Sequence, residues 1–135
     1  MIRIKAKKVA PGIARAKAIV SHTAISFTGG VDPGTGIVRE PGHELEGQSI
    51  AGKILVFPQG KGSTTGSWQF YATWKRGNAP KGIINVRAEG VVAVSAVITG
   101  TPMVHELDQD PFQFISNGDF VTINADEGFV EVEKN

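Results

Sequence analysis

A loop rich in glycine and hydroxyl side chains carries the residue types best suited to chemistry. It runs from Gly60 to Ser67, between a short apolar run and a segment with helical spacing. Glycines permit positive φ angles and let a ligand approach the backbone closely. Because the loop opens a helix, unpaired backbone N–H groups and the positive end of the helix dipole should face it. Such an arrangement binds phosphate or carboxylate.

The spacing of this loop excludes two familiar nucleotide-binding motifs. A Walker A loop ends in Gly-Lys-Ser/Thr, whereas Lys61 precedes Gly62 and Ser63 here. The glycines do not match a dinucleotide-binding fingerprint either. A helix capped by Ser63 or Thr64, with a flexible entry loop, explains the pattern equally well. The functional alternative is that the local field favours ionisation of a serine hydroxyl.

The segments around the loop predict a strand–loop–helix–strand unit. Residues 50–57 hold a continuous apolar run, which is typical of a strand buried on both faces. Aromatic residues at helical spacing predict a helix over residues 67–76, ended by Gly77. A second buried strand is predicted at 83–86. A right-handed crossover would make the two strands parallel.

The remaining segments are predicted to be mostly strands. Alternating apolar and polar residues indicate four of them, at 2–6, 14–20, 120–123 and 129–132. The first two should pair with each other. Residues 91–98 favour a short buried helix, although their β-branched content is also compatible with a strand. We expect one α/β domain over residues 1–135, a compact mixed sheet or barrel with a few short helices.

Composition limits the class of function. The 135 residues carry a net charge of +1 and no basic block, so nothing suggests nucleic acid as a partner. No apolar run approaches the length of a membrane span, and the first residues do not resemble a signal peptide. The absence of cysteine excludes disulfides and thiolate ligation of a metal or iron–sulfur cluster by this chain, and it fits a cytoplasmic protein.

A set of short motifs, spread along the chain in a fixed order, resembles the swivel domain, or small subunit, of the aconitase X family. The most specific is Leu55-Val56-Phe57-Pro58-x-Gly60-x-Gly62-Ser63-x-x-Gly66-Ser67. Before it come Gly29-Gly30-Val31-Asp32-Pro33-x-Thr35-Gly36 and Gly42-His43-x-Leu45-x-Gly47. After it come Ile83-Ile84-Asn85, Ile98-Thr99-Gly100-Thr101-Pro102-Met103-Val104 and Gly118-Asp119-x-Val121. The resemblance covers almost the whole chain, and the ordered set is far more specific than any single block.

The resemblance implies a swivelling β/β/α fold and a small subunit that docks on an aconitase-like large subunit. The large subunit would carry an iron–sulfur cluster, whereas this chain would bind no cofactor and no metal. The likeness is strongest to free-standing archaeal subunits of the family. It therefore implies a hydro-lyase that dehydrates (R)-5-phosphomevalonate to trans-anhydromevalonate 5-phosphate in the archaeal mevalonate (isoprenoid) pathway. This chain alone should be inactive.

The resemblance also implies a catalytic base. The family's serine maps onto Ser63, which as an alkoxide would take the proton next to the substrate carboxylate, while the cluster iron acts as a Lewis acid on the hydroxyl. An ordinary serine hydroxyl is too weakly acidic for this task, so the loop must supply N–H donors and exclude water. Ser67 is the second candidate base, but a residue one turn inside a helix usually packs. The residues expected to bind substrate are Gly62, Thr64, Thr65, Gly66 and Ser67.

Several charged residues have roles that the sequence leaves open. Asp32 suits a turn, with contact to substrate or partner as the alternative. Lys61 is either a solvated loop lysine or a ligand for substrate phosphate. Arg87 and Glu89 follow a buried strand, where ligand-binding residues gather in α/β sheets, and a surface ion pair is equally compatible with them.

The histidines suggest one competing function. His43 and His105 are isolated, so neither indicates a metal site. His22, with the later block at 100–104, resembles the phosphohistidine swivelling domains, in which a histidine carries phosphate. However, the glycine pair that normally precedes that histidine follows it here, and the usual Ala-Arg is absent. A non-catalytic assembly subunit of the same fold is a third possibility, against which the intact Ser63 loop counts.

Overall fold

The computed structural model describes all 135 residues and shows one mixed sheet whose two edges are joined by the chain. The strand order is β1-β8-β7-β3-β4-β5-β6-β2. The edge strands are β1 (Ile2–Lys5) and β2 (Lys7–Ala10), which are separated only by Ala6. The sheet therefore curls until its edges meet, as expected for a compact sheet or barrel.

The other strands fall into a parallel and an antiparallel part. Their bounds are β3 (Ile13–Val20), β4 (Ile54–Phe57), β5 (Gly82–Asn85), β6 (Met103–His105), β7 (Phe120–Asn124) and β8 (Phe129–Glu133). Neighbours from β3 to β6 are parallel, whereas β1, β8, β7 and β3 pair antiparallel. The predicted parallel crossover between β4 and β5 is confirmed.

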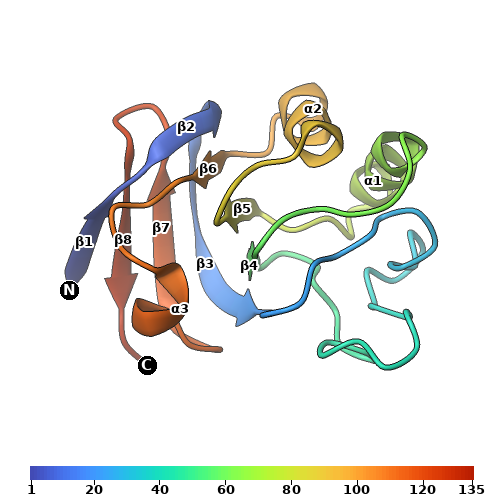
Figure 1. Cartoon of the computed structure of the whole chain (residues 1–135), viewed down its shortest axis with the longest axis horizontal. Helices are drawn as coiled ribbons and strands as arrows, with labels where there is room; N and C mark the ends of the chain where they lie inside the picture. The colour runs from blue at the N-terminus through green and yellow to red at the C-terminus, as the bar shows by residue number, and fades with distance from the viewer.

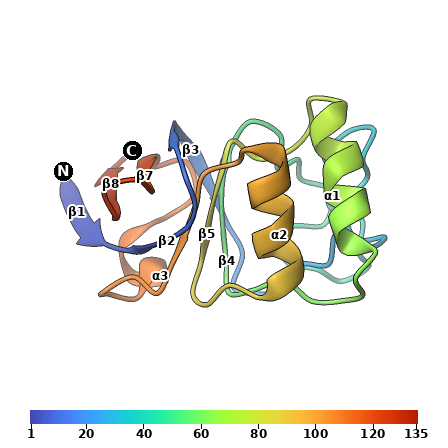
Figure 2. The same cartoon turned by 90° about the horizontal axis from the view of Figure 1, so that it is seen from above.

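Three helices complete the fold, namely α1 (Gly66–Lys75), α2 (Gly90–Thr99) and the short α3 (Pro111–Phe114). Figure 2 shows the layers: the antiparallel strands lie at one end, the parallel strands in the middle, and α1 and α2 at the other end. This is the β/β/α arrangement that the family resemblance implies. The helix at 91–98 is confirmed, and Gly100 ends it in the left-handed conformation, at φ 68°.

The parallel strands separate two hydrophobic cores. Ile54 and Val56 of β4 pack into the core enclosed by the curled sheet, whereas Leu55 and Phe57 pack between the sheet and the helices. All four side chains are fully buried. Successive strand residues point to opposite faces, so a strand covered on both sides reads as one apolar run. This explains why the sequence pattern located β4 correctly.

The predicted pairing of the first two strands is wrong. β1 pairs with β8 and β2 with β6, whereas β3 pairs with β7 and β4. The chain changes partners at Ala6, whose N–H donates to the carbonyl of Gly128 at 2.9 Å. Alternation along a strand tells which face each residue takes but not which strand lies beside it. Adjacency in the sequence therefore predicted the wrong partner for each of these two strands.

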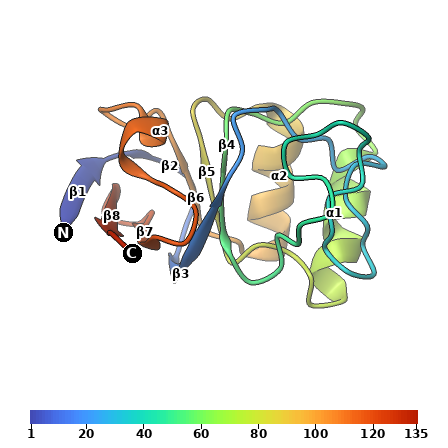
Figure 3. The ribbon, with the colours of Figure 1, turned by 90° about the horizontal axis from the view of Figure 1, so that it is seen from below.

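A long irregular segment, residues 21–53, links β3 to β4 and lies beside α1 at the helical end of the molecule (Figures 1 and 3). Its buried side chains join the core beneath the helices; they are Ile25, Phe27, Val31, Val38, Leu45 and Ile50. An isolated parallel bridge joins Ile25 to Gly60. The segment is thereby fixed against the glycine-rich loop.

Candidate functional site

The loop from Pro58 to Thr65 joins the carboxyl end of β4 to the start of α1. The N–H of Ile25 donates to Gln59 O at 3.3 Å, and the N–H of Lys61 donates to Ile25 O at 3.0 Å. A Cβ atom on Gly60 would lie 2.5 Å from both Glu89 Oε1 and Val92 Cγ2. The loop can therefore pass this close to the start of α2 only with glycine at position 60.

The start of α1 differs from the prediction. The helix begins at Gly66, Thr65 occupies the N-cap position, and no side chain caps the helix, so neither Ser63 nor Thr64 does. The N–H groups of residues 62–65 and of Ser67 donate no hydrogen bond within the chain. Uncapped N–H groups at a helix start favour a bound anion. The loop thus keeps its own donors free for a ligand.

The hydroxyl of Ser63 points to two other hydroxyls. Its Oγ lies 2.7 Å from Thr65 Oγ1 and 3.4 Å from Thr28 Oγ1, and either atom of each pair can donate. Ser67 differs, because its Oγ donates to the carbonyl of Thr64 at 3.1 Å. Hydroxyl neighbours can donate to an alkoxide, whereas a carbonyl only accepts. The surroundings of Ser63 suit a serine anion better than those of Ser67.

A hollow of about 410 Å³ opens where the two larger helices begin. The residues that line it are Thr64, Ser67, Glu89, Gly90, Val91 and Val94. Ser63 and Thr65 are not among them. Ser67 therefore faces a ligand-sized space instead of packing inside the helix, contrary to the expectation for a residue one turn in.

Glu89 has a structural role at this hollow. Its carboxylate accepts hydrogen bonds from the N–H groups of Val91 at 3.0 Å and Val92 at 2.7 Å, which caps α2. It forms no ion pair with Arg87, so the ion-pair alternative is not found, and Arg87 has no ionic partner elsewhere in the chain. The Glu89 carboxylate thus pairs the first N–H groups of α2, whereas the start of α1 has no side-chain cap.

The other acidic and basic residues singled out from the sequence also stabilise loops. Lys61 Nζ lies 2.9 Å from Glu40 Oε2, so this lysine is paired rather than merely solvated. Asp32 Oδ1 accepts from the N–H of Gly34 at 2.9 Å, as a turn aspartate does. This backbone hydrogen bond is the main reason that the pKa of Asp32 lies below its ordinary value of 3.8.

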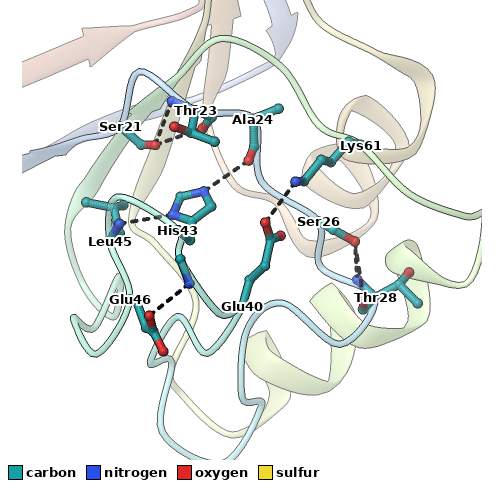
Figure 4. A network of polar contacts seen from close by, with 11 residues as sticks. Ser21, Thr23, Ala24, Ser26, Thr28, Glu40, His43, Leu45, Glu46 and Lys61 are labelled. Atoms are coloured by element: carbon teal, nitrogen blue, oxygen red, sulfur yellow. Dashed lines mark hydrogen bonds and ion pairs between the residues drawn. The ribbon is translucent and has the colours of Figure 1, made fainter.

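None of the three histidines lies in the loop. His43 is buried: its Nδ1 accepts from the N–H of Leu45, so Nε2 carries the proton toward Ala24 O (Figure 4). His105 Nδ1 accepts from the N–H of Ala88. No group of three or more His, Cys, Asp or Glu side chains in the chain is placed to hold a metal ion.

His22, the proposed phosphate carrier of the alternative function, is tied to Glu44. The distance from the His22 ring Nδ1 to Glu44 Oε2 is 3.0 Å, and the backbone N–H of His22 donates to the same carboxylate at 2.8 Å. Burial raises the pKa of Glu44, but these bonds outweigh burial and hold the pKa below its ordinary value of 4.5. The imidazole therefore contacts a carboxylate and joins two surface segments.

An exposed apolar groove of about 250 Å³ lies beside the loop. It is lined by Ser67, Trp68, Tyr71 and Ile98, so it shares Ser67 with the hollow described above. α2 contains no charged residue, yet Val94, Val97 and Ile98 are exposed on it. Large exposed apolar patches mark interaction sites. Helical spacing in the sequence predicts a helix only around Trp68 and Tyr71, and it gives no sign that these side chains face outward.

The known relatives place the chain in a family. A family model described as the aconitase X swivel domain matches residues 3–132. The chain belongs to the aconitase X swivel-domain family. A crystal structure described as Thermococcus kodakaraensis aconitase X in its holo-form superposes on this swivel domain with a TM-score of 0.93. That match is 46% identical and covers 99% of this chain and 100% of the other.

Two curated relatives of this aconitase X swivel domain carry the same description. The phosphomevalonate dehydratase small subunit of Methanocella arvoryzae is 49% identical, over 97% of this chain and 99% of its own length. The phosphomevalonate dehydratase small subunit of Thermococcus gammatolerans is 51% identical, over 97% of this chain and 98% of its own. The family resemblance stated from the sequence is confirmed. No helix of the structure is long and apolar enough to cross a membrane.

Proposed function

We propose that this chain is the small subunit of a cytoplasmic two-chain hydro-lyase that dehydrates (R)-5-phosphomevalonate to trans-anhydromevalonate 5-phosphate. The observation that carries the proposal is near full-length similarity, at 42 to 51% identity, to relatives described as small subunits of that dehydratase. The loop adds chemical support, because free N–H donors and a cluster of hydroxyls lie at one helix start.

In this proposal Ser63 is the base. As an alkoxide it takes the proton from the carbon next to the substrate carboxylate and becomes a neutral hydroxyl again. Its 2.7 Å contact with Thr65 and the uncapped start of α1 support the anion beforehand. In the proposal, Thr64 and Ser67 and the N–H groups of residues 62–65 bind the substrate's anionic groups; the hollow that Thr64 and Ser67 line and the free N–H groups support this.

The iron–sulfur cluster implied by the family does not fit this chain. The sequence has no cysteine, and no cluster of metal-ligating side chains forms in the fold. In this proposal the cluster, and the Lewis-acid chemistry that it would supply, belong to a large subunit. We propose that this large subunit docks over the apolar groove, because the groove adjoins a site that needs a second chain to be complete.

The experiment is reconstitution with the purified large subunit, with product formation followed by mass spectrometry. Ser63→Ala should lower kcat by roughly a hundredfold or more, the usual contribution of a general base, and should leave the affinity between the subunits unchanged. Ser67→Ala is the comparison variant: it should raise KM, because Ser67 is proposed to bind substrate, and should leave kcat near the wild-type value. Loss with Ser67→Ala alone would assign the base to Ser67. Full activity of both variants would make this chain an assembly subunit and overturn the proposal.

A further inference from the structure

Thr28, which no sequence motif singled out, lies beside the proposed base. Its Oγ1 is 3.4 Å from Ser63 Oγ and 3.2 Å from Thr65 Oγ1, while Ser63 Oγ and Thr65 Oγ1 are 2.7 Å apart. The three hydroxyls, hereafter the hydroxyl triangle, are thus mutually within hydrogen-bonding distance. Two of them belong to the loop before α1, and the third comes from the segment between β3 and β4.

The residue before Thr28 anchors this segment against both ends of the loop. Phe27 is only 3% exposed, and its ring meets the rings of Phe70 and Phe57 edge to face, at centroid distances of 4.9 and 6.5 Å. Phe70 belongs to α1 and Phe57 ends β4. Such aromatic pairs add specific geometry to apolar burial. The position of Thr28 is therefore fixed relative to the elements that carry Ser63.

A local turn and two glycines, Gly62 in the loop and Gly66 at the start of α1, complete the placement. The N–H of Thr28 donates to Ser26 Oγ at 3.2 Å (Figure 4). A Cβ atom on Gly62 would lie 2.5 Å from that same Ser26 Oγ, and one on Gly66 would lie 3.3 Å from Thr28 Oγ1. The loop and the segment around Thr28 approach each other closely because glycine stands at both positions.

We propose that Thr28 is a positioning residue whose hydroxyl, together with that of Thr65, donates to Ser63 Oγ when Ser63 is ionised. This inference rests on the proposed role of Ser63 as base. In the neutral hydroxyl triangle, three hydroxyl protons are available for the three hydrogen bonds between its oxygen atoms. When Ser63 releases its proton to water, two protons remain, and both can turn toward the Ser63 oxygen. Hydrogen bonds to an ionised acceptor are shorter and roughly twice as strong as neutral ones.

The expected size of the effect follows from the length of this contact. Loss of one well-placed oxyanion donor costs roughly a hundredfold to a thousandfold in kcat. The 3.4 Å contact of Thr28 is longer than an ideal O–H···O bond, although such bonds tighten in the reacting complex. We therefore expect Thr28→Val, which keeps the shape and removes the hydroxyl, to lower kcat about tenfold, below the full donor effect.

The test uses the reconstituted two-chain enzyme. Thr28→Val should lower kcat without a matching rise in KM, and the rise of kcat with pH should move to higher pH because the Ser63 anion loses a donor. Thr28→Ser, which keeps the hydroxyl, should restore most of kcat and the original pH profile. Thr23→Val is the control on the same segment. It removes an exposed hydroxyl that makes no hydrogen bond, and the variant should behave as wild type.

The outcomes separate this inference from the proposed function. An unchanged pH profile and kcat in Thr28→Val, with Ser63→Ala inactive, would overturn the role of Thr28 alone. Equal losses in Thr28→Val and Thr28→Ser would also overturn it, because the methyl group and not the hydroxyl would then matter. Full activity of Ser63→Ala would instead refute the base assignment. Thermal unfolding of each variant shows whether any loss arises from misfolding.

Discussion

Lys61 Nζ lies 2.9 Å from Glu40 Oε2, which ties the middle of the glycine-rich loop to the segment between β3 and β4 (Figure 4). The side chains are 44% and 29% exposed. A pair this exposed contributes at most about 1 kcal/mol, because water screens it and both side chains lose freedom. The ion pair occupies the Lys61 ammonium group, so this side chain is not a free cation in the loop.

This ion pair predicts a double-mutant result. Lys61→Met and Glu40→Gln should each lower the free energy of unfolding by less than about 1 kcal/mol. The double variant should lose less than the sum, because each single change already breaks the pair. Urea unfolding of the four proteins measures the coupling. In the reconstituted enzyme, a large rise of KM in Lys61→Met but not in Glu40→Gln would contradict the purely structural role of Lys61. Lys61 would then bind substrate directly.

Gly62 should tolerate no side chain. Its φ is 103°, and an added Cβ would lie 2.5 Å from Ser26 Oγ. Gly47 is a matched control, with φ 84° and nothing within 4 Å of the added Cβ. Gly47→Ala should cost about 1 kcal/mol of stability from backbone strain alone. Gly62→Ala should cost more and should also lower activity, since the loop must move away from Ser26. Equal losses of stability, measured by thermal unfolding, would show that the close approach does not matter.

Asp119 should make stability depend on acid pH. Burial raises the pKa of this carboxyl, but hydrogen bonds from Lys134 and from the backbone of Ser116 and Asn135 outweigh burial and hold the pKa below its ordinary value of 3.8. A folded-state pKa that is lowered stabilises the fold above the unfolded-state value. That contribution disappears as the pH falls through the folded-state value.

The corresponding experiment compares unfolding free energies of wild type and Asp119→Asn from pH 7 downward. The wild type should be the more stable at pH 7, and the difference should shrink below about pH 4, where the unfolded-state carboxyl takes up its proton. Asp108→Asn changes an exposed carboxylate without a hydrogen-bond partner and should show no such trend. A wild-type advantage that persists at pH 2 would contradict the assignment.

Ile98 should contribute to docking of the large subunit. It lines the apolar groove and is 60% exposed, whereas Ile13 of β3 is 63% exposed outside the groove. Ile98→Glu should weaken the affinity between the subunits at least about tenfold, equivalent to about 1.4 kcal/mol, because a charge would be buried in an apolar contact. Ile13→Glu should leave the affinity unchanged. Calorimetric titration measures both, and similar affinities of the two variants would place the interface elsewhere.

Local sequence patterns predicted the elements whose burial or end points can be read from neighbouring residues. β4 was recognisable because both of its faces are buried, and α2 because Gly100 and Pro102 end it. α3 escaped because a four-residue helix has no periodicity to detect. The loop was correctly placed before a helix, but the cap was not, because the hydroxyl of Ser63 turns to Thr65 rather than to the helix backbone.

Long-range relationships were beyond the sequence. Nothing near Thr28 indicates Ser63 as a neighbour, since the approach depends on Phe27 packing against Phe70 and on glycine at positions 62 and 66. Nor does alternation in β1 reveal β8 as its partner. Such contacts depend on how whole elements pack against one another. A single sequence shows which residues are small or apolar enough to allow such packing, but not which elements meet.

β3 takes part in both halves of the sheet, and this should make unfolding cooperative. Residues 13–17 pair with β7, residues 18–20 pair with β4, and Ala18 and Ile19 belong to different cores. Fraying of the helical layer would expose β3 and weaken the antiparallel ladder as well. The most slowly exchanging amides should therefore occur in both halves and share one opening free energy, that of global unfolding.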